Sequence, residues 1–259
     1  MKFFLYKELV IIFITRELLA SYKQTLFGPL WIVINPIITS FVFVIIFNKI
    51  GKIQTGEIPP FLFFFLGISV WNFLQANTIQ ISNFYNTNSG LFSKVYFPRL
   101  IVPISYLFIN AIKFFIQFFI FFLLSLFFFN IKLDLNFNSI FIILYIFLYT
   151  SLFSFFFGLL INAFTYIIKD ISNIMTYFFT ILFFLTPVAY SVSSVPDKFK
   201  NFLVFNPLSQ IFELLRYAIF SIGEINFFFI FVSIVFLFTL ILIGSFFYKI
   251  TEQNFIDTV

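Results

Sequence analysis

Two residue types that serve much of enzyme chemistry are absent from this chain. The sequence contains no cysteine and no histidine. Without cysteine there is no disulfide and no thiol nucleophile. Without histidine there is no imidazole base and no histidine ligand for a metal, so a zinc site of the HExxH type is excluded.

Charge is also scarce. Charged residues make up 10% of the 259 residues, whereas ordinary soluble domains carry about 25%. Hydrophobic residues make up 62%, and the mean hydropathy is +1.10. Water could not solvate such a surface, so the composition predicts an all-α integral membrane protein with a single domain. The net charge of +5 is scattered, which argues against nucleic-acid binding and suits anionic lipid headgroups.

The motifs of ATP hydrolysis are missing as well. No GxxxxGK[ST] phosphate loop occurs, and no pair of carboxylates falls within an apolar run. We therefore expect no catalysis by this chain and no cofactor bound to it. If it transports a substrate, another protein must supply the energy.

Uncharged runs predict the membrane spans, because a transmembrane helix needs ~20 mostly apolar residues. Six helices are expected, near residues 30–49, 60–82, 101–129, 138–163, 173–190 and 226–247. An even number puts both termini on one side of the membrane. A slight excess of Lys and Arg on that side places the termini in the cytosol.

Two segments differ from the spans. Residues 1–25 mix apolar and charged side chains, which predicts an interfacial helix in the headgroup plane. Residues 187–225 contain apolar pieces too short to cross, 202–205 and 208–220. Such pieces are compatible with a re-entrant hairpin on the outer side or with a plain surface loop.

Polar residues inside the expected spans follow helical spacing. One set is Trp71, Gln75, Thr78 and Ser82, and the other is Tyr106, Asn110, Lys113 and Gln117. Each set lies on one face of a helix and either bonds neighbouring helices or lines a polar pathway. Lys113 needs a partner or a water-filled space, unless its span starts later and the side chain reaches the surface. The fourth span has a small-residue face, Ser151, Ser154 and Gly158, suited to close helix contact.

The stretch Leu91 to Pro103, LFSKVYFPRLIVP, is a basic and aromatic turn between two long apolar runs. Such a turn is typical of a loop at the membrane surface. Together with other segments it resembles a known family. These segments are YKQTLFGPLWIVINP (22–36), FLGISVWNF (65–73), Asn88 with KVYFPRLIVP (94–103), IIKDI (167–171), TPVAYSVSSVP (186–196) and NPLSQIFELLRYAIF (206–220).

In order and spacing, these segments resemble the membrane permease of ABC-2 type exporters, in particular the subfamily that exports O-antigen, teichoic acid and related polysaccharides. The similarity runs nearly end to end. One departure is Lys169-Asp170, where the family usually has Arg-Asp.

The resemblance implies a homodimer of six-helix subunits in the bacterial plasma membrane, with the export channel between them. It implies two copies of a separate cytosolic ATPase, which would bind ATP and Mg. Residues 1–259 would form one domain, with an interfacial helix at 1–25, a cytosolic coupling loop at 83–100 and an outer gate hairpin at 187–225.

Roles for individual residues follow from this resemblance. The ATPase-coupling residues would be Lys94, Tyr96, Phe97, Pro98 and Arg99. The outer-gate residues would be Pro187, Tyr190, Pro207 and Arg216. The channel-lining candidates are the two polar sets above together with Trp31, Asn35, Tyr145, Tyr149 and Tyr177.

We therefore expect an ATP-driven exporter permease for a lipid-linked polysaccharide. The KVYFPR loop, the compact outer segment and the lack of a large external domain favour that cargo over a drug or a small lipid, which is the alternative within the same transporter class. A third hypothesis is a membrane enzyme of lipid-sugar metabolism, which would be active without any ATPase.

Overall fold

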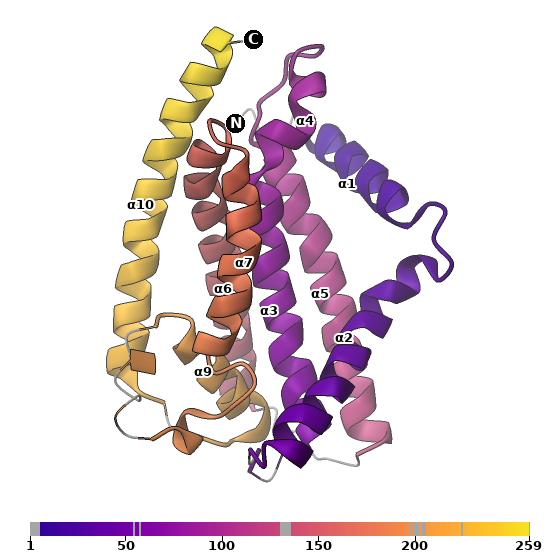
Figure 1. Cartoon of the computed structure of the whole chain (residues 1–259), viewed down its shortest axis with the longest axis vertical. Coiled ribbons are helices and arrows are strands. Elements are labelled where there is room, and N and C mark those ends of the chain that lie inside the picture. The colour runs from indigo at the N-terminus through magenta and orange to yellow at the C-terminus, as the bar shows by residue number, and fades with distance from the viewer. Residues whose placement is uncertain are drawn as a thin grey trace.

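The structure, a computed structural model, is a bundle of helices with no strand among the residues it describes (Figure 1). It describes residues 6–258 except 54, 57, 130–135, 197, 199–201, 204, 205 and 224. The α-helices are α1 (Lys7–Tyr22), α2 (Trp31–Phe43), α3 (Pro60–Ser82), α4 (Phe84–Phe92), α5 (Ile101–Phe127), α6 (Phe137–Thr165), α7 (Asp170–Leu185), α9 (Ser209–Phe220) and α10 (Phe227–Thr258). Shorter turns are η2 (Gly28–Leu30), the π-helical η3 (Val44–Ile50) and η4 (Val192–Ser194).

Five helical segments of the described chain are long and apolar enough to cross a membrane. They are Gly28–Ile50, α3, α5, α6 and Phe227–Gln253 of α10. The predicted bounds of the second span agree with α3. The predicted fifth span, 173–190, corresponds to α7, which has 16 residues and ends at Leu185. At ~1.5 Å per residue this helix is ~24 Å long, shorter than a ~30 Å hydrocarbon core, so helix length does not confirm six spans.

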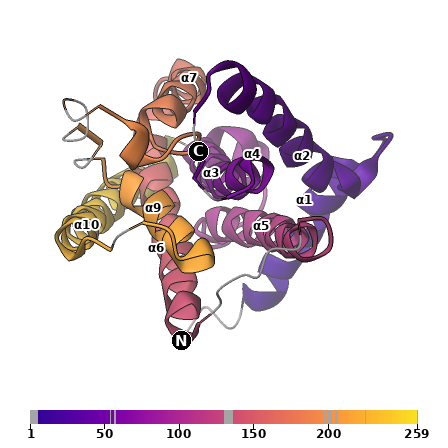
Figure 2. The same cartoon turned by 90° about the horizontal axis from the view of Figure 1, so that it is seen from below.

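The centre of the bundle is α3. In its most apolar stretch 78% of the residues are buried, against 11% to 33% in the other four spans. Seen along the bundle, α3 lies inside a ring of α2, α5, α6 and α7 (Figure 2), and it packs against each of these helices. Most of an apolar helix surrounded in this way is buried, so the polar side chains on its buried faces must bond within the protein.

Close contact between α3 and α6 depends on Gly158. A Cβ atom added at this glycine would lie 2.7 Å from the Cβ of Ile81 and 3.2 Å from the carbonyl oxygen of Thr78. Ser151 and Ser154, on the same side of α6, are buried. Gly158 of the predicted small-residue face is therefore confirmed as a point of close helix contact.

The two ends of the bundle are built differently (Figure 1). The short helix α4 and the C-terminal end of α10 lie at one end, and α1 slants away from that end along the outside of α5. A second apolar cluster joins these elements, with Phe13 of α1, Phe84 and Phe92 of α4, Phe97 and Ile101 among its buried members. We call this the α4 end.

The opposite end contains the described residues between α7 and α10 (Figure 1). The apolar piece predicted at 208–220 is the helix α9, and Ser221 ends it in the left-handed conformation with φ of 54°. Part of the other predicted piece, residues 204 and 205, lies outside the described residues. A re-entrant hairpin of two helices is therefore not confirmed, and neither is a plain loop.

Candidate functional site

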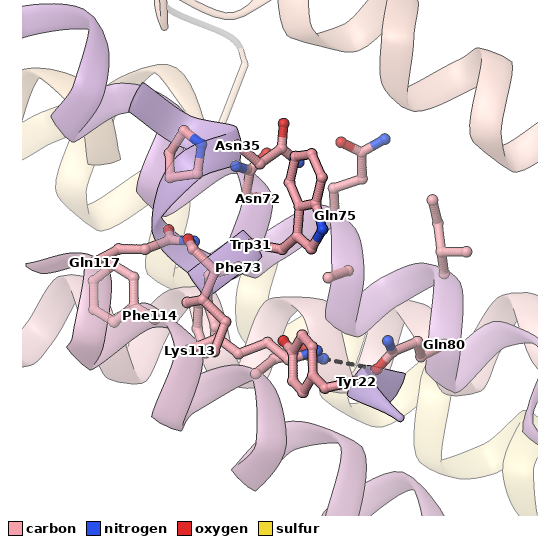
Figure 3. Close-up of a pocket in the computed structure, with 15 residues that line it drawn as sticks. Tyr22, Trp31, Asn35, Asn72, Phe73, Gln75, Gln80, Lys113, Phe114 and Gln117 are labelled. Atoms are coloured by element: carbon pink, nitrogen blue, oxygen red, sulfur yellow. Dashed lines mark hydrogen bonds between the residues drawn. The ribbon is translucent and has the colours of Figure 1, made fainter. Parts of the chain in front are cut away.

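A polar cavity lies between α2, α3 and α5. It has a volume of about 420 Å³, and Tyr22 at the end of α1 also lines it. Its polar and aromatic lining residues include Tyr22, Trp31, Asn35, Asn72, Gln75, Gln80, Asn110, Lys113 and Gln117 (Figure 3). Six of these residues, namely Trp31, Asn35, Gln75, Asn110, Lys113 and Gln117, are among the predicted channel-lining candidates, and the structure brings them together around one space.

Asn110 links α5 to α3 at this cavity. Its Nδ2 donates to Oδ1 of Asn77 at 2.9 Å and to Oε1 of Gln80 at 2.9 Å. Asn110 is 3% exposed and Asn77 is fully buried. In apolar surroundings such a side-chain bond between helices contributes ~1 kcal/mol. Asn110 therefore bonds two helices and lines the cavity at once, so the two interpretations of this polar face are compatible.

Gln117 donates a hydrogen bond to a backbone carbonyl that a proline leaves without a partner. Pro36 lies inside α2 and has no N–H, so the carbonyl four residues earlier, at Ile32, lacks its usual helical partner. The Nε2 of Gln117 donates to this Ile32 oxygen at 3.0 Å. Gln117 thus satisfies a half-buried backbone acceptor that the helix itself leaves without a donor, and it links α5 to α2.

Lys113 lies in the same cavity without a carboxylate within 4.0 Å in the described part of the chain. Its Nζ lies 5.8 Å from the ring centroid of Tyr22, within the range of a cation–π contact. Helix α5 begins at Ile101, not near residue 110, but Lys113 is level with the end of α1. The aromatic partner and the open space agree with the first sequence interpretation, whereas the helix shows no later start as the alternative supposed.

The other predicted channel residues lie elsewhere. Trp71, Thr78 and Ser82 are buried in the bundle, where Trp71 contacts aromatic rings of α7 and α9. On other helices, Tyr106 accepts a hydrogen bond from Asn88 at 3.0 Å, Tyr145 and Tyr149 bond to Ser233 of α10, and Tyr177 is 72% exposed on α7. None of these seven residues lines the polar cavity.

Sequence reasoning missed Tyr22, Asn72 and Gln80 as members of the cavity. On α3 the cavity is lined by Asn72, Phe73, Gln75, Ala76, Ile79 and Gln80. This face is rotated by about one residue, roughly 100°, from the expected set that starts at Trp71. The missed signal was the four-residue spacing from Asn72 through Ala76 to Gln80, which also marks one helix face.

A second candidate site is the turn at the α4 end, residues 93–100. Lys94 is exposed and Tyr96 is 98% exposed. Phe97 points inward instead, with its ring centroid 5.6 Å from that of Phe13 and 5.5 Å from that of Phe92. Pro98 is exposed. The turn therefore presents Lys94, Tyr96 and Pro98 on an anchored support, and we call these three residues the tip.

Arg99 connects this turn to α10. Its Nη1 donates to the backbone oxygen of Glu252 at 3.2 Å, and its Cζ lies 5.9 Å from the ring centroid of Tyr85. Burial raises the pKa of Tyr85 to about 12, and Arg99 opposes that rise. The phenol therefore stays protonated at neutral pH. A displacement of the turn would be passed to α4 and α10 through these contacts.

Arg216 organises the opposite end. It is 5% exposed, and its Nη1 bonds Oε1 of Glu213 at 2.8 Å. Its Nη2 donates to the backbone oxygens of Pro187 at 2.5 Å and Val188 at 3.2 Å. The guanidinium also lies 4.2 Å from the ring centroid of Phe63 on α3. Glu213 in turn accepts a hydrogen bond from the N–H of Val192.

The other predicted gate residues surround this centre. Pro187 is an acceptor for Arg216, and Tyr190 donates to the backbone oxygen of Phe184 at 3.1 Å. Pro207 follows Asn206, whose side chain donates to Thr186 at 3.0 Å. The four predicted residues thus lie in one neighbourhood. No group of three or more carboxylates that could hold a metal ion occurs among the described residues.

Comparison with known proteins gives a consistent result. The profile of the ABC-2 type transporter family matches residues 8–220. A protein of Klebsiella pneumoniae named O-antigen export system permease protein RfbA is 22% identical over 240 residues, covering 92% of this chain and 89% of that protein. A protein of the same name from Myxococcus xanthus is 25% identical over 225 residues, covering 78% of this chain and 76% of that protein.

Proposed function

The chain belongs to the ABC-2 type transporter family, and on that premise we propose that it is the permease of an ATP-driven exporter of a lipid-linked polysaccharide. The main support for this proposal is the similarity, over most of both chains, to proteins named O-antigen export system permease. A multi-pass membrane protein with five apolar spanning helices is compatible with this role. Family membership also implies an ATPase subunit as partner.

We propose the following arrangement for the whole assembly. Two copies of this chain would enclose the export path, in the plasma membrane of a bacterium, with both termini in the cytosol. Helix α7 would complete six spans, α1 would lie at the inner interface, and residues 187–225 would gate the outer side. Exposed apolar and aromatic side chains lie along α7 and α2, for example Tyr177, Ile181 and Ile38. They support a location of these helices against lipid or against a second copy of the chain.

The tip is the proposed docking point for the ATPase. Tyr96 is an exposed aromatic side chain beside a lysine and a proline, and exposed aromatic residues are common energetic centres of protein interfaces. ATP and Mg would be bound by the partner. Closure of two ATPases would push the tips, and Phe97 and Arg99 would carry the motion to α1, α4 and α10 through the contacts described above.

Purification of the tagged chain in mild detergent tests this function. We expect a stoichiometric protein with a phosphate loop to accompany it, and cells carrying it to display the glycan. A chain that purifies alone under several mild conditions, and acts on lipid-linked sugars by itself, would contradict the permease assignment.

Variants of the tip test the docking point. Tyr96→Ala should release the ATPase without changing insertion or folding, because this side chain has almost no contact with the rest of the chain. Arg99→Glu should also uncouple export. Phe128→Ala is the matched control, since it removes an aromatic side chain that is 77% exposed at the opposite end of α5. Normal glycan export by Tyr96→Ala and Arg99→Glu would exclude this turn as the coupling loop.

A further inference from the structure

The polar cavity is not isolated, because an apolar groove adjoins it. This groove has a volume of about 730 Å³ and lies between α1, the start of α2, and α5. Its walls include Leu18, Leu19, Pro29, Ile112 and Ile116. Tyr22 and Ile32 line both spaces, so the polar cavity and the apolar groove share a boundary.

The cavity side offers a cation and amide groups. Lys113 has no carboxylate at ion-pair distance in the described chain, and Glu17 of α1 acts on it only from farther away. Figure 3 shows Lys113 and Tyr22 together, with Asn35, Asn72 and Gln75 at the other end of the labelled group. Within the described chain, no hydrogen bond is found for the side-chain amides of Asn35, Asn72 and Gln75. Amide N–H groups and a lysine are donors suited to a phosphate.

The groove side offers a mainly apolar surface. Leu19 is 72% exposed, and Ile112 and Ile116 are also exposed on the neighbouring helix α5. Among the described residues that line the groove, Lys23 is the single charged one. A hydrocarbon chain would cover these side chains, whereas a peptide or a sugar would bring polar groups against them without partners.

The position along the bundle fits a lipid headgroup. Tyr22 ends α1, and Trp31 begins α2 a few residues later, so both mark the level at which the chain turns into its first span. Tyrosine and tryptophan favour this interfacial level in membrane proteins. Lys113 lies at the same level, since it contacts Tyr22 and lines the cavity with Trp31.

We propose that the cavity and the groove form one binding site for a phosphate-bearing amphiphile, with the phosphate beside Lys113 and the hydrocarbon chain between α1 and α5. The inference deepens the proposed function, because it gives the lipid part of a lipid-linked cargo a place in this chain. Its test measures lipid binding alone. If no lipid binds, the permease assignment is unaffected, because that assignment depends on the ATPase partner. If no ATPase co-purifies, the lipid site is unaffected, because lipid binding is measured on the chain by itself.

The two tryptophans of the chain provide a built-in reporter. Trp71 is buried in the bundle, whereas Trp31 is 43% exposed and lines the cavity. In a Trp71→Phe background, Trp31 is the remaining fluorophore of that type. The full chain is held in maltoside micelles, which contain no phosphate, and is titrated with phosphatidic acid that carries bromine on its acyl chains. Bromine quenches tryptophan at contact range.

We expect the brominated phosphatidic acid to quench Trp31 in a saturable way. Lys113→Gln should lower the affinity for this lipid about tenfold, which is the effect of losing one charge-assisted hydrogen bond. Lys113→Arg should bind nearly as well as the parent. Lys169→Gln is the matched control, because it removes the same charge from an exposed turn outside the cavity and should change nothing. Brominated diacylglycerol, which lacks the phosphate, should bind more weakly and should not respond to Lys113→Gln.

The groove has its own variant. Ile112→Gln places an amide on an already exposed position of α5, so folding should persist while phosphatidic acid binds several-fold more weakly. Soluble glycerol phosphate should compete only at much higher concentration. Equal binding by Lys113→Gln and the parent would overturn the proposal. Competition by glycerol phosphate as effective as that by the lipid would also overturn it, since the groove would then contribute nothing.

Discussion

The surroundings of two cations inside the bundle, Arg216 and Lys113, differ sharply. Arg216 has a carboxylate, two backbone carbonyls and an aromatic ring around its guanidinium. Among the described residues, the ring of Tyr22 is the one charge-stabilising contact found for Lys113, whose side chain lines a cavity. A buried charge whose bonds are complete holds structure together, whereas a charge with bonding capacity left over is available to a ligand. The comparison separates a structural arginine from a candidate binding lysine.

The largest expected effect is at Arg216. Arg216→Met would leave Glu213 without its cation and the oxygens of Pro187 and Val188 without their donor. Removing one member of a buried pair costs about 3–5 kcal/mol. We expect a large loss in the free energy of unfolding, measured by circular dichroism during titration with a denaturing detergent.

The matched control for that variant is the double change Arg216→Met with Glu213→Gln. It removes the isolated carboxylate as well, so part of the lost stability should return. If Arg216→Met alone were as stable as the parent, the arginine would not be the structural centre of this end.

A smaller effect is expected at Gln117, the residue that fixes the cavity wall. Gln117→Leu keeps the side-chain volume but leaves the Ile32 carbonyl without a donor, because Pro36 cannot supply one. A fully buried acceptor without a donor costs about 1–3 kcal/mol, and the half-buried Ile32 carbonyl beside the cavity should cost no more than the lower part of that range. The same unfolding titration measures this loss.

Gln75→Leu is the comparison for Gln117→Leu. Gln75 also lines the cavity, but no hydrogen bond of its side chain is found in the described structure. Its replacement should change stability far less. Equal losses for the two variants would mean that the bond to Ile32 contributes nothing specific.

The smallest effect on stability is expected at Lys113. Lys113→Met removes a cation that has no ion-pair partner in the described residues, and an apolar side chain of similar length costs nothing in desolvation. The free energy of unfolding should stay the same or rise slightly. A loss comparable to that of Arg216→Met would show that Lys113 is structural and would remove the distinction between the two cations.

Much of the fold follows from the distribution of charged residues and prolines. Helix α3 begins at Pro60 and ends at Ser82, as the sequence predicts, since proline is favoured in the first helical turn. The end of α10 was predicted at residue 247, but the helix continues to Thr258. Charges such as Lys249 and Glu252 end a membrane span because lipid excludes them, yet they are compatible with a helix that continues into water.

The choice among helix faces was harder to predict. On α3, the set that starts at Trp71 and the set that starts at Asn72 both fit helical spacing. Trp71, Thr78 and Ser82 of the first set are buried in the bundle. Gln75 of that set reaches the cavity together with Asn72 and Gln80 of the second set. Periodicity cannot distinguish the two sets when a helix has neighbours on every side, as α3 has.

The sequence by itself determined that this chain is helical, lies in a membrane and belongs with ABC-2 permeases, because composition, uncharged runs and ordered motifs are properties of the linear chain. Only the tertiary structure decided which polar groups meet. Gln117 bonds Ile32 across 85 positions, and Arg216 bonds Pro187 across 29. The physical reason is that hydropathy measures what each segment avoids, whereas a hydrogen bond or an open cavity depends on which helices become neighbours and at what rotation.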